Sequence, residues 1–148
     1  MTEPKSELLK DHAEMERLLS LFSGAVAAND ECQDLQAIWA RVEALIVDHI
    51  QTEEREFFPL VVGAHAAEVE ELRTEHRFIR QTLAKLGLEL ELHSLRKPEA
   101  DELIAFLRRH AQRENETLYH WLAERPDDSL RNIVQHMLGR RQSQQSVP

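Results

Sequence analysis

The stretch "HIQTEEREFFP", residues 49–59, decides how this chain is interpreted. It lies in a predicted amphipathic helix, and it holds His49 and Glu53 four residues apart. A spacing of four places two side chains one above the other on one helical face. That face is the apolar one, because the pair continues the spacing of Val42 and Leu45. The stretch therefore places a histidine and a carboxylate where core residues are expected.

Apolar residues recurring every three or four positions predict four long helices. Their approximate ranges are 6–28, 34–58, 66–92 and 99–123. Pro59 and Gly63 are expected to end the second helix. Because long helices joined by short loops pack antiparallel, the fold class predicted is all-α, an up-and-down antiparallel four-helix bundle. A short fifth C-terminal helix, ending near Leu138, is expected to cap one end of the bundle.

Length and composition restrict the function classes. At 148 residues the chain suits one domain, predicted over residues 1–138, followed by a flexible tail at 139–148. The formal net charge of −9 argues against nucleic acid as a partner. No apolar run is long enough for a membrane span or a secretory leader. Cys32 is the only cysteine, which fits a reducing compartment, so a cytoplasmic protein is expected, as a monomer or homodimer.

Histidines interrupt the apolar stripe of all four predicted helices. The inward-facing polar residues are His12, His49, Glu53, His76, His110 and Glu114. An ionised carboxylate buried without a partner carries a large desolvation penalty. Two carboxylates with four imidazoles in one interior therefore indicate a metal centre. The alternative is a buried polar network without metal. In such a network, any buried group that lacks part of its hydrogen bonds would lower the stability of the fold.

The number and type of these residues favour a pair of metal ions. A single tetrahedral zinc takes four ligands, and calcium and magnesium prefer oxygen to imidazole. Two six-coordinate ions can use four histidines, two bridging carboxylates and an oxo or hydroxo bridge, and still keep open positions. The mixture of imidazole and carboxylate suits iron or manganese. A pair of such ions is therefore expected.

The second half of the chain repeats the first. "HIQTEEREFF" from His49 aligns with "HAQRENETLY" from His110, and Asp11-His12 resembles Glu75-His76. Single histidines on the first and third helices, with His-x-x-x-Glu on the second and fourth, resemble the hemerythrin-like HHE cation-binding family over about residues 6–123. The resemblance implies a non-haem di-iron centre in an up-and-down bundle that binds O2 or a related molecule. The cofactor it implies is two iron ions, with manganese or zinc as weaker alternatives. The resemblance also implies that the six residues named above are the metal ligands.

The chain departs from oxygen-carrying hemerythrins on its third helix. Those proteins have a second histidine four residues after the first, and here that position is Arg80, which is expected to reach water or pair with an acid. Glu16 and Glu56 are weaker candidates for an additional ligand. Glu54 is expected to turn to solvent. Tyr119 is expected to pack in the bundle, too far along its helix from His110 to ligate.

Three function hypotheses follow from this pattern. The leading one is a di-iron protein that binds O2, peroxide or NO in the handling of oxygen, oxidative or nitrosative stress. The second is a redox enzyme on the same centre, for peroxide disproportionation, NO reduction or iron-sulfur repair. The third is an iron or oxygen sensor that acts through a partner.

Overall fold

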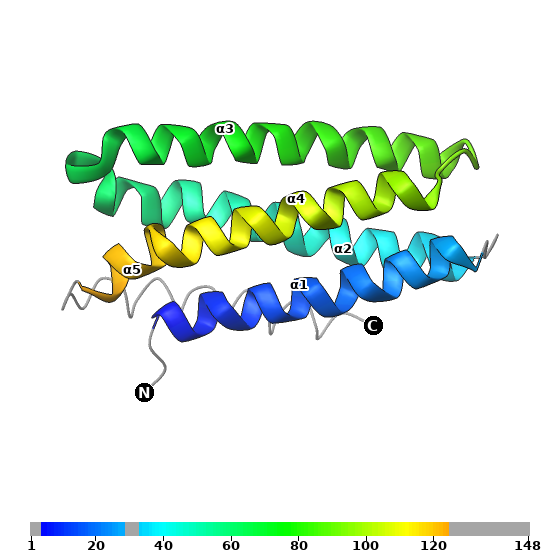
Figure 1. Ribbon diagram of the computed structural model, residues 1–148, viewed down its shortest axis with the longest axis horizontal. Coiled ribbons are helices and arrows are strands. Elements are labelled where there is room, and N and C mark those ends of the chain that lie inside the picture. Colours follow the sequence, from blue (N-terminus) through cyan, green and yellow to red (C-terminus); the bar gives the residue numbers. More distant parts are fainter. Residues whose placement is uncertain (1–3, 29–32, 125–148) are drawn as a thin grey trace.

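The computed structural model describes residues 4–28 and 33–124, and every regular element within them is helical. The all-α class is confirmed for this part of the chain. Four helices are long: α1 (Pro4–Ala27), α2 (Gln33–Thr52), α3 (Phe58–Glu91) and α4 (Lys97–Glu116). They lie side by side with alternating direction (Figure 1). Helix α1 packs on α2 and α4, and α3 packs on the same two helices.

Two short helical elements follow α2 and α4. A π-helical turn, η1 (Glu53–Phe57), continues α2, and α5 (Leu118–Ala123) follows α4 after a break at Thr117. The backbone of Thr117 has φ −117° and ψ −87°, which is not helical. The predicted helix over 99–123 is therefore interrupted. Helix α5 packs against α1 and α3.

The predicted boundary between the second and third helices is wrong in one respect. Pro59 lies in the first turn of α3, where a residue without an N–H group is tolerated, so it begins a helix instead of ending one. The predicted start near residue 66 matches a kink at His65, whose φ of −133° and ψ of 40° divide α3. The predicted end of the second helix at Phe58 falls one residue after η1.

Two apolar clusters form the core of the described chain. The larger one joins the four long helices and includes Phe22, Ile46 and Leu103. The smaller one gathers η1, the start of α3 and α5, and includes Phe57 and Leu118. Along α3 and α4, buried polar residues separate the two clusters. The core thus contains a polar layer with apolar packing on both sides.

Two expectations concern regions beyond the helices described above. The predicted fifth helix ending near Leu138, and the tail at 139–148, lie outside the described residues.

Among the described helices, none has the length and apolar character needed to cross a membrane.

The larger apolar cluster leads to a stability prediction. Phe22 is fully buried, so we expect Phe22→Ala to lower the free energy of unfolding by about 3–5 kcal/mol, through lost burial and the cavity left behind. Leu88→Ala is the matched control, because Leu88 is 57% exposed and should change stability by about 0.5 kcal/mol or less. Chemical denaturation measures both. Equal losses for the two variants would contradict this description of the core.

Candidate metal centre

The structure brings all six predicted polar residues into the layer between the two apolar clusters. His12 comes from α1, His49 from α2, His76 from α3, and His110 and Glu114 from α4, while Glu53 is the first residue of η1. Both glutamates and His76 are fully buried. The side chain of His12 is the most accessible of the six, at 12% exposed.

The six side chains form two overlapping groups. One, here called the α1/α2 half, comprises His12, His49, Glu53 and Glu114. The other, the α3/α4 half, comprises Glu53, His76, His110 and Glu114. Within each group one ligand-type atom per residue lies within 4.8 Å of all the others. The two glutamates belong to both groups, so each carboxylate has an oxygen available to either half.

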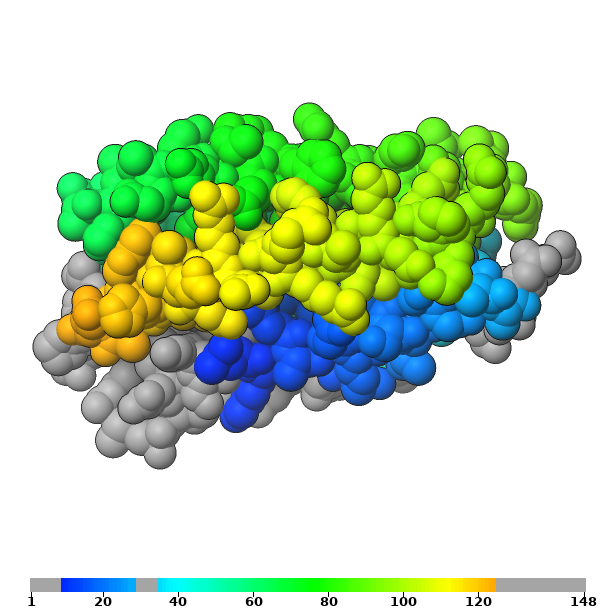
Figure 2. Space-filling model, viewed as in Figure 1, coloured from blue at the N-terminus to red at the C-terminus, as the bar shows by residue number. Residues whose placement is uncertain are grey.

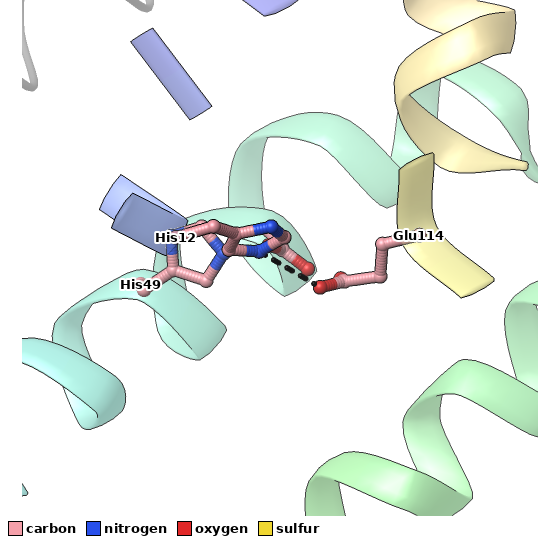
Figure 3. Close-up of side chains that lie close together, drawn as sticks. His12, His49 and Glu114 are labelled. Carbon is pink, nitrogen blue, oxygen red and sulfur yellow. Dashed lines mark ion pairs between the residues drawn. The ribbon is translucent and has the colours of Figure 1, made fainter. Parts of the chain in front are cut away.

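Glu114 lies at the junction of the two halves. Its Oε1 is 3.3 Å from Nε2 of His12 and 3.2 Å from Nε2 of His110. Its Oε2 is 3.7 Å from Nε2 of His76. The close-up shows His12, His49 and Glu114 pointing toward one another from three different helices (Figure 3). Glu53 likewise contacts Nε2 of His49 and lies 3.5 Å from that of His76.

Several of these inward-facing atoms fit a cation better than they fit one another. Among the described residues, five buried atoms that face the interior of the centre have no hydrogen-bond partner. They are Oε2 of Glu53, Nε2 of His76, Nε2 of His110, and both carboxylate oxygens of Glu114. Such atoms are rare in protein interiors, and each is of a type that binds transition metals. The donor set therefore fits a metal centre.

A second layer of carboxylates orients three of the four histidines. Asp11 accepts a hydrogen bond from Nδ1 of His49 at 2.9 Å, and Glu75 accepts one from Nδ1 of His110 at 2.8 Å. Glu54 accepts one from Nδ1 of His76 at 2.9 Å. A carboxylate that holds Nδ1–H directs Nε2 inward and makes the imidazole a stronger metal donor.

Arginines pair with two of these outer carboxylates. Arg80 donates to both oxygens of Glu54, at 2.9 and 3.0 Å, and Arg113 contacts Glu75. The prediction that Arg80 pairs with an acid is confirmed, whereas Glu54 does not turn to solvent as expected. Glu16 pairs with Arg108 and belongs to neither half. Glu56 also lies outside both groups.

The predicted distance of Tyr119 from the centre is wrong. Its hydroxyl oxygen lies 2.8 Å from Nε2 of His12, 3.0 Å from Nε2 of His49 and 2.9 Å from Oε1 of Glu53. The expectation assumed a continuous helix from His110, whereas the break at Thr117 redirects the chain and α5 packs back toward α1. The phenol thus belongs to the centre.

A model of the Hemerythrin HHE cation binding domain matches residues 4–122. The chain belongs to this family. The match spans both halves of the centre, and the family description itself indicates cation binding. Comparison with curated proteins and with solved structures gives no significant match.

The charges in this hemerythrin-like centre raise the pKa of three of its histidines. Burial alone would lower the pKa of His49, but the Glu53 carboxylate and the Asp11 hydrogen bond raise it to about 10. Burial would also lower the pKa of His76, but the carboxylates of Glu114, Glu53 and Glu54 raise it to about 11. Glu114 and Glu75 raise the pKa of His110 to about 9 against burial. A cation that binds at Nε2 must displace a proton held there.

A cavity of about 330 Å³ reaches the centre between α1 and α4. Three of the histidines and Glu114 line it, together with apolar side chains that include Leu19, Ile46 and Ile79. Glu16 and Arg108, both exposed, also line the cavity, and their ion pair joins α1 to α4 at the surface. Figure 2 shows the face on which these two helices meet.

Sequence reasoning missed the second layer and the phenol. The repeat of Asp11-His12 in Glu75-His76 was a usable signal, because each acid supports the histidine of the following helix. The role of Glu54 could not be recognised from the sequence, because it lies beside Glu53 in an acidic run that is typical of a solvated helix face. For Tyr119 no local signal exists, because its place depends on the break at Thr117.

The raised histidine pKa values predict opposite pH trends for stability and metal uptake. A histidine whose pKa rises on folding stabilises the fold below its unfolded pKa of about 6.5, and this contribution is lost as pH rises through the folded pKa. Protein stripped with a chelator should therefore lose stability as pH rises through about 9 to 11. Metal binding should release protons and strengthen with pH over that window.

Denaturation at several pH values measures the first trend, and calorimetry in buffers of different ionisation enthalpy measures the second. Metal-loaded protein is the matched control, because a metal bound at Nε2 would take the place of these protons, so the stability loss should be smaller. Equal pH profiles for stripped and loaded protein, with no proton release, would contradict the assigned protonation.

Proposed function

We propose that this chain is a non-haem di-iron protein of hemerythrin-like type that binds O2, NO or peroxide. The observation that carries the proposal is the pair of overlapping donor groups that share Glu53 and Glu114. Two groups with two common carboxylates suit two adjacent ions better than one. The mixed imidazole and carboxylate donors favour iron over zinc or manganese.

The six residues of the centre and the carboxylates around them would have different roles. His12, His49, His76 and His110 would hold the metals, and Glu53 and Glu114, which belong to both groups, would be shared between them. The outer carboxylates fix the imidazole tautomers, so Nε2 is directed at the metal. An iron pair bound there would supply reversible binding of O2, NO or peroxide together with electron exchange.

The cavity supports a small ligand. Its apolar lining suits neutral diatomic molecules, and its position beside His12 gives such a molecule a route to the α1/α2 half. We place the protein in oxygen, oxidative or nitrosative stress handling in the cytoplasm, as a monomer or homodimer. The frame in this proposal is an up-and-down four-helix bundle formed by the four long helices.

Arg80 favours ligand turnover as a second candidate function. Its guanidinium pairs with Glu54, so the third-helix position that oxygen-carrying hemerythrins fill with histidine supplies no metal ligand. A coordination position is then left for a substrate such as peroxide. Oxygen evolution after peroxide addition separates turnover from simple binding.

Metal analysis tests the leading proposal. We expect purified protein to hold about two iron ions per chain, since the donor set suits two six-coordinate ions. The iron absorption should change on adding NO or O2. Glu114→Ala should lose most of the iron, because it removes a carboxylate common to both halves.

His120→Ala is the matched control, since the His120 side chain is 59% exposed and belongs to neither half. It should retain full iron content. Protein that stays folded yet takes up no iron under reducing, anaerobic loading would overturn the di-iron proposal.

The second layer gives a separate prediction. Glu54→Gln removes the charge that holds Nδ1–H of His76, so metal affinity should fall by about 10–100-fold. Glu70→Gln, an exposed carboxylate on the same helix as His76, should leave affinity unchanged. Competition with a chelator of known affinity measures both variants. Equal affinities would show that Glu54 has no part in orienting the ligand.

A further inference from the structure

Tyr119 occupies the α1/α2 half in the manner of a ligand. Its side chain is fully buried, and its hydroxyl oxygen lies within 3.0 Å of one donor atom from each of His12, His49 and Glu53. Those three atoms belong to residues of one candidate metal group. The phenol oxygen thus lies beside three of the atoms that would bind an ion, at the spacing of neighbouring donors.

The internal repeat supplies a comparison within the same chain. Phe58 stands nine residues after His49, as Tyr119 stands nine after His110. The Phe58 ring stacks on His76 with 5.4 Å between centroids, and the Tyr119 ring lies over His12 at 5.1 Å. A phenyl ring therefore suffices for packing in the α3/α4 half, and the hydroxyl is specific to the α1/α2 half.

The hydroxyl contacts three polar atoms, whereas packing alone would need only the ring. It donates to Oε1 of Glu53 at 2.9 Å, and its oxygen can accept from Nε2 of His12 and of His49. The phenol oxygen is therefore next to two imidazole nitrogens and a carboxylate, which are donor types that transition metals bind.

We propose that Tyr119 is a seventh protein ligand, whose phenolate oxygen binds the metal ion of the α1/α2 half. This inference rests on the proposed di-iron function. As the oxygen–metal bond forms, the O–H bond breaks and its proton passes to bulk water, with no change in oxidation state. The two ions then differ, because the α3/α4 half offers a phenyl ring at the equivalent position.

The spectrum of the ferric protein tests this directly. A phenolate bound to Fe(III) gives a charge-transfer band in the visible region, where carboxylate and imidazole ligands give little absorption. Tyr119 is the only tyrosine in the chain, so any such band belongs to it. We expect the wild-type protein to show the band, and Tyr119→Phe to lose it while keeping about two irons.

Trp121→Phe is the matched control, because Trp121 is also an aromatic residue of α5 but stacks on His65 instead of the centre. It should keep the band. A second readout avoids both iron redox chemistry and mutation: loading stripped wild-type protein with Ga(III) should produce the ultraviolet difference spectrum of tyrosinate. That readout decides the matter even if Tyr119→Phe fails to fold.

The outcomes separate the two proposals. Two irons per chain with neither the visible band nor the tyrosinate difference spectrum would overturn Tyr119 as a ligand and leave the di-iron function standing. A band that persists in Tyr119→Phe would overturn it in the same way. Failure of folded protein to take up any metal would overturn the di-iron function itself.

Discussion

The burial of two glutamates in the middle of the core is the constraint on which this structure depends. Glu53 and Glu114 are both 0% exposed, with apolar clusters on either side of their layer. Ionised carboxylates are stable there only with compensating groups close by. The imidazoles supply the first compensation, and acids and arginines around them continue the alternation of charge outward. A bound metal pair would complete it from the inside.

The helical irregularities also belong to this layer. The π-helical turn begins at Glu53, and the break at Thr117 follows soon after Glu114. At about 100° per residue, a position nine residues along a regular helix faces the opposite side. Phe58 and Tyr119 can therefore lie over the histidines only because the helices preceding them are irregular. π-Helical turns such as η1 are common at functional sites, and here the π-helical turn and the break at Thr117 have the same effect, because each brings the aromatic residue that follows it over a histidine.

The two halves share a plan and differ in detail. Asp11 and Glu75 play equivalent roles, each supporting the histidine on the next helix. Glu54 holds His76, but the equivalent residue is Asn115, whose Oδ1 is buried without a hydrogen-bond partner, as is Nδ1 of His12. The cavity reaches His12 and Asn115. The α1/α2 half is thus the less tightly held one, and it carries the phenol.

The sequence alone determined the helical class and the six polar residues that face the interior together. Both follow from local periodicity, since a polar residue at a core position of a helix must face inward wherever the helix packs. The place of Tyr119 could not be predicted, because it depends on a break at Thr117 that helical periodicity does not reveal. The role of Glu54 likewise depends on Arg80 and His76, which reach it only when α3 folds back along η1. Only the tertiary structure decided these, because they arise from contacts between segments distant in the chain.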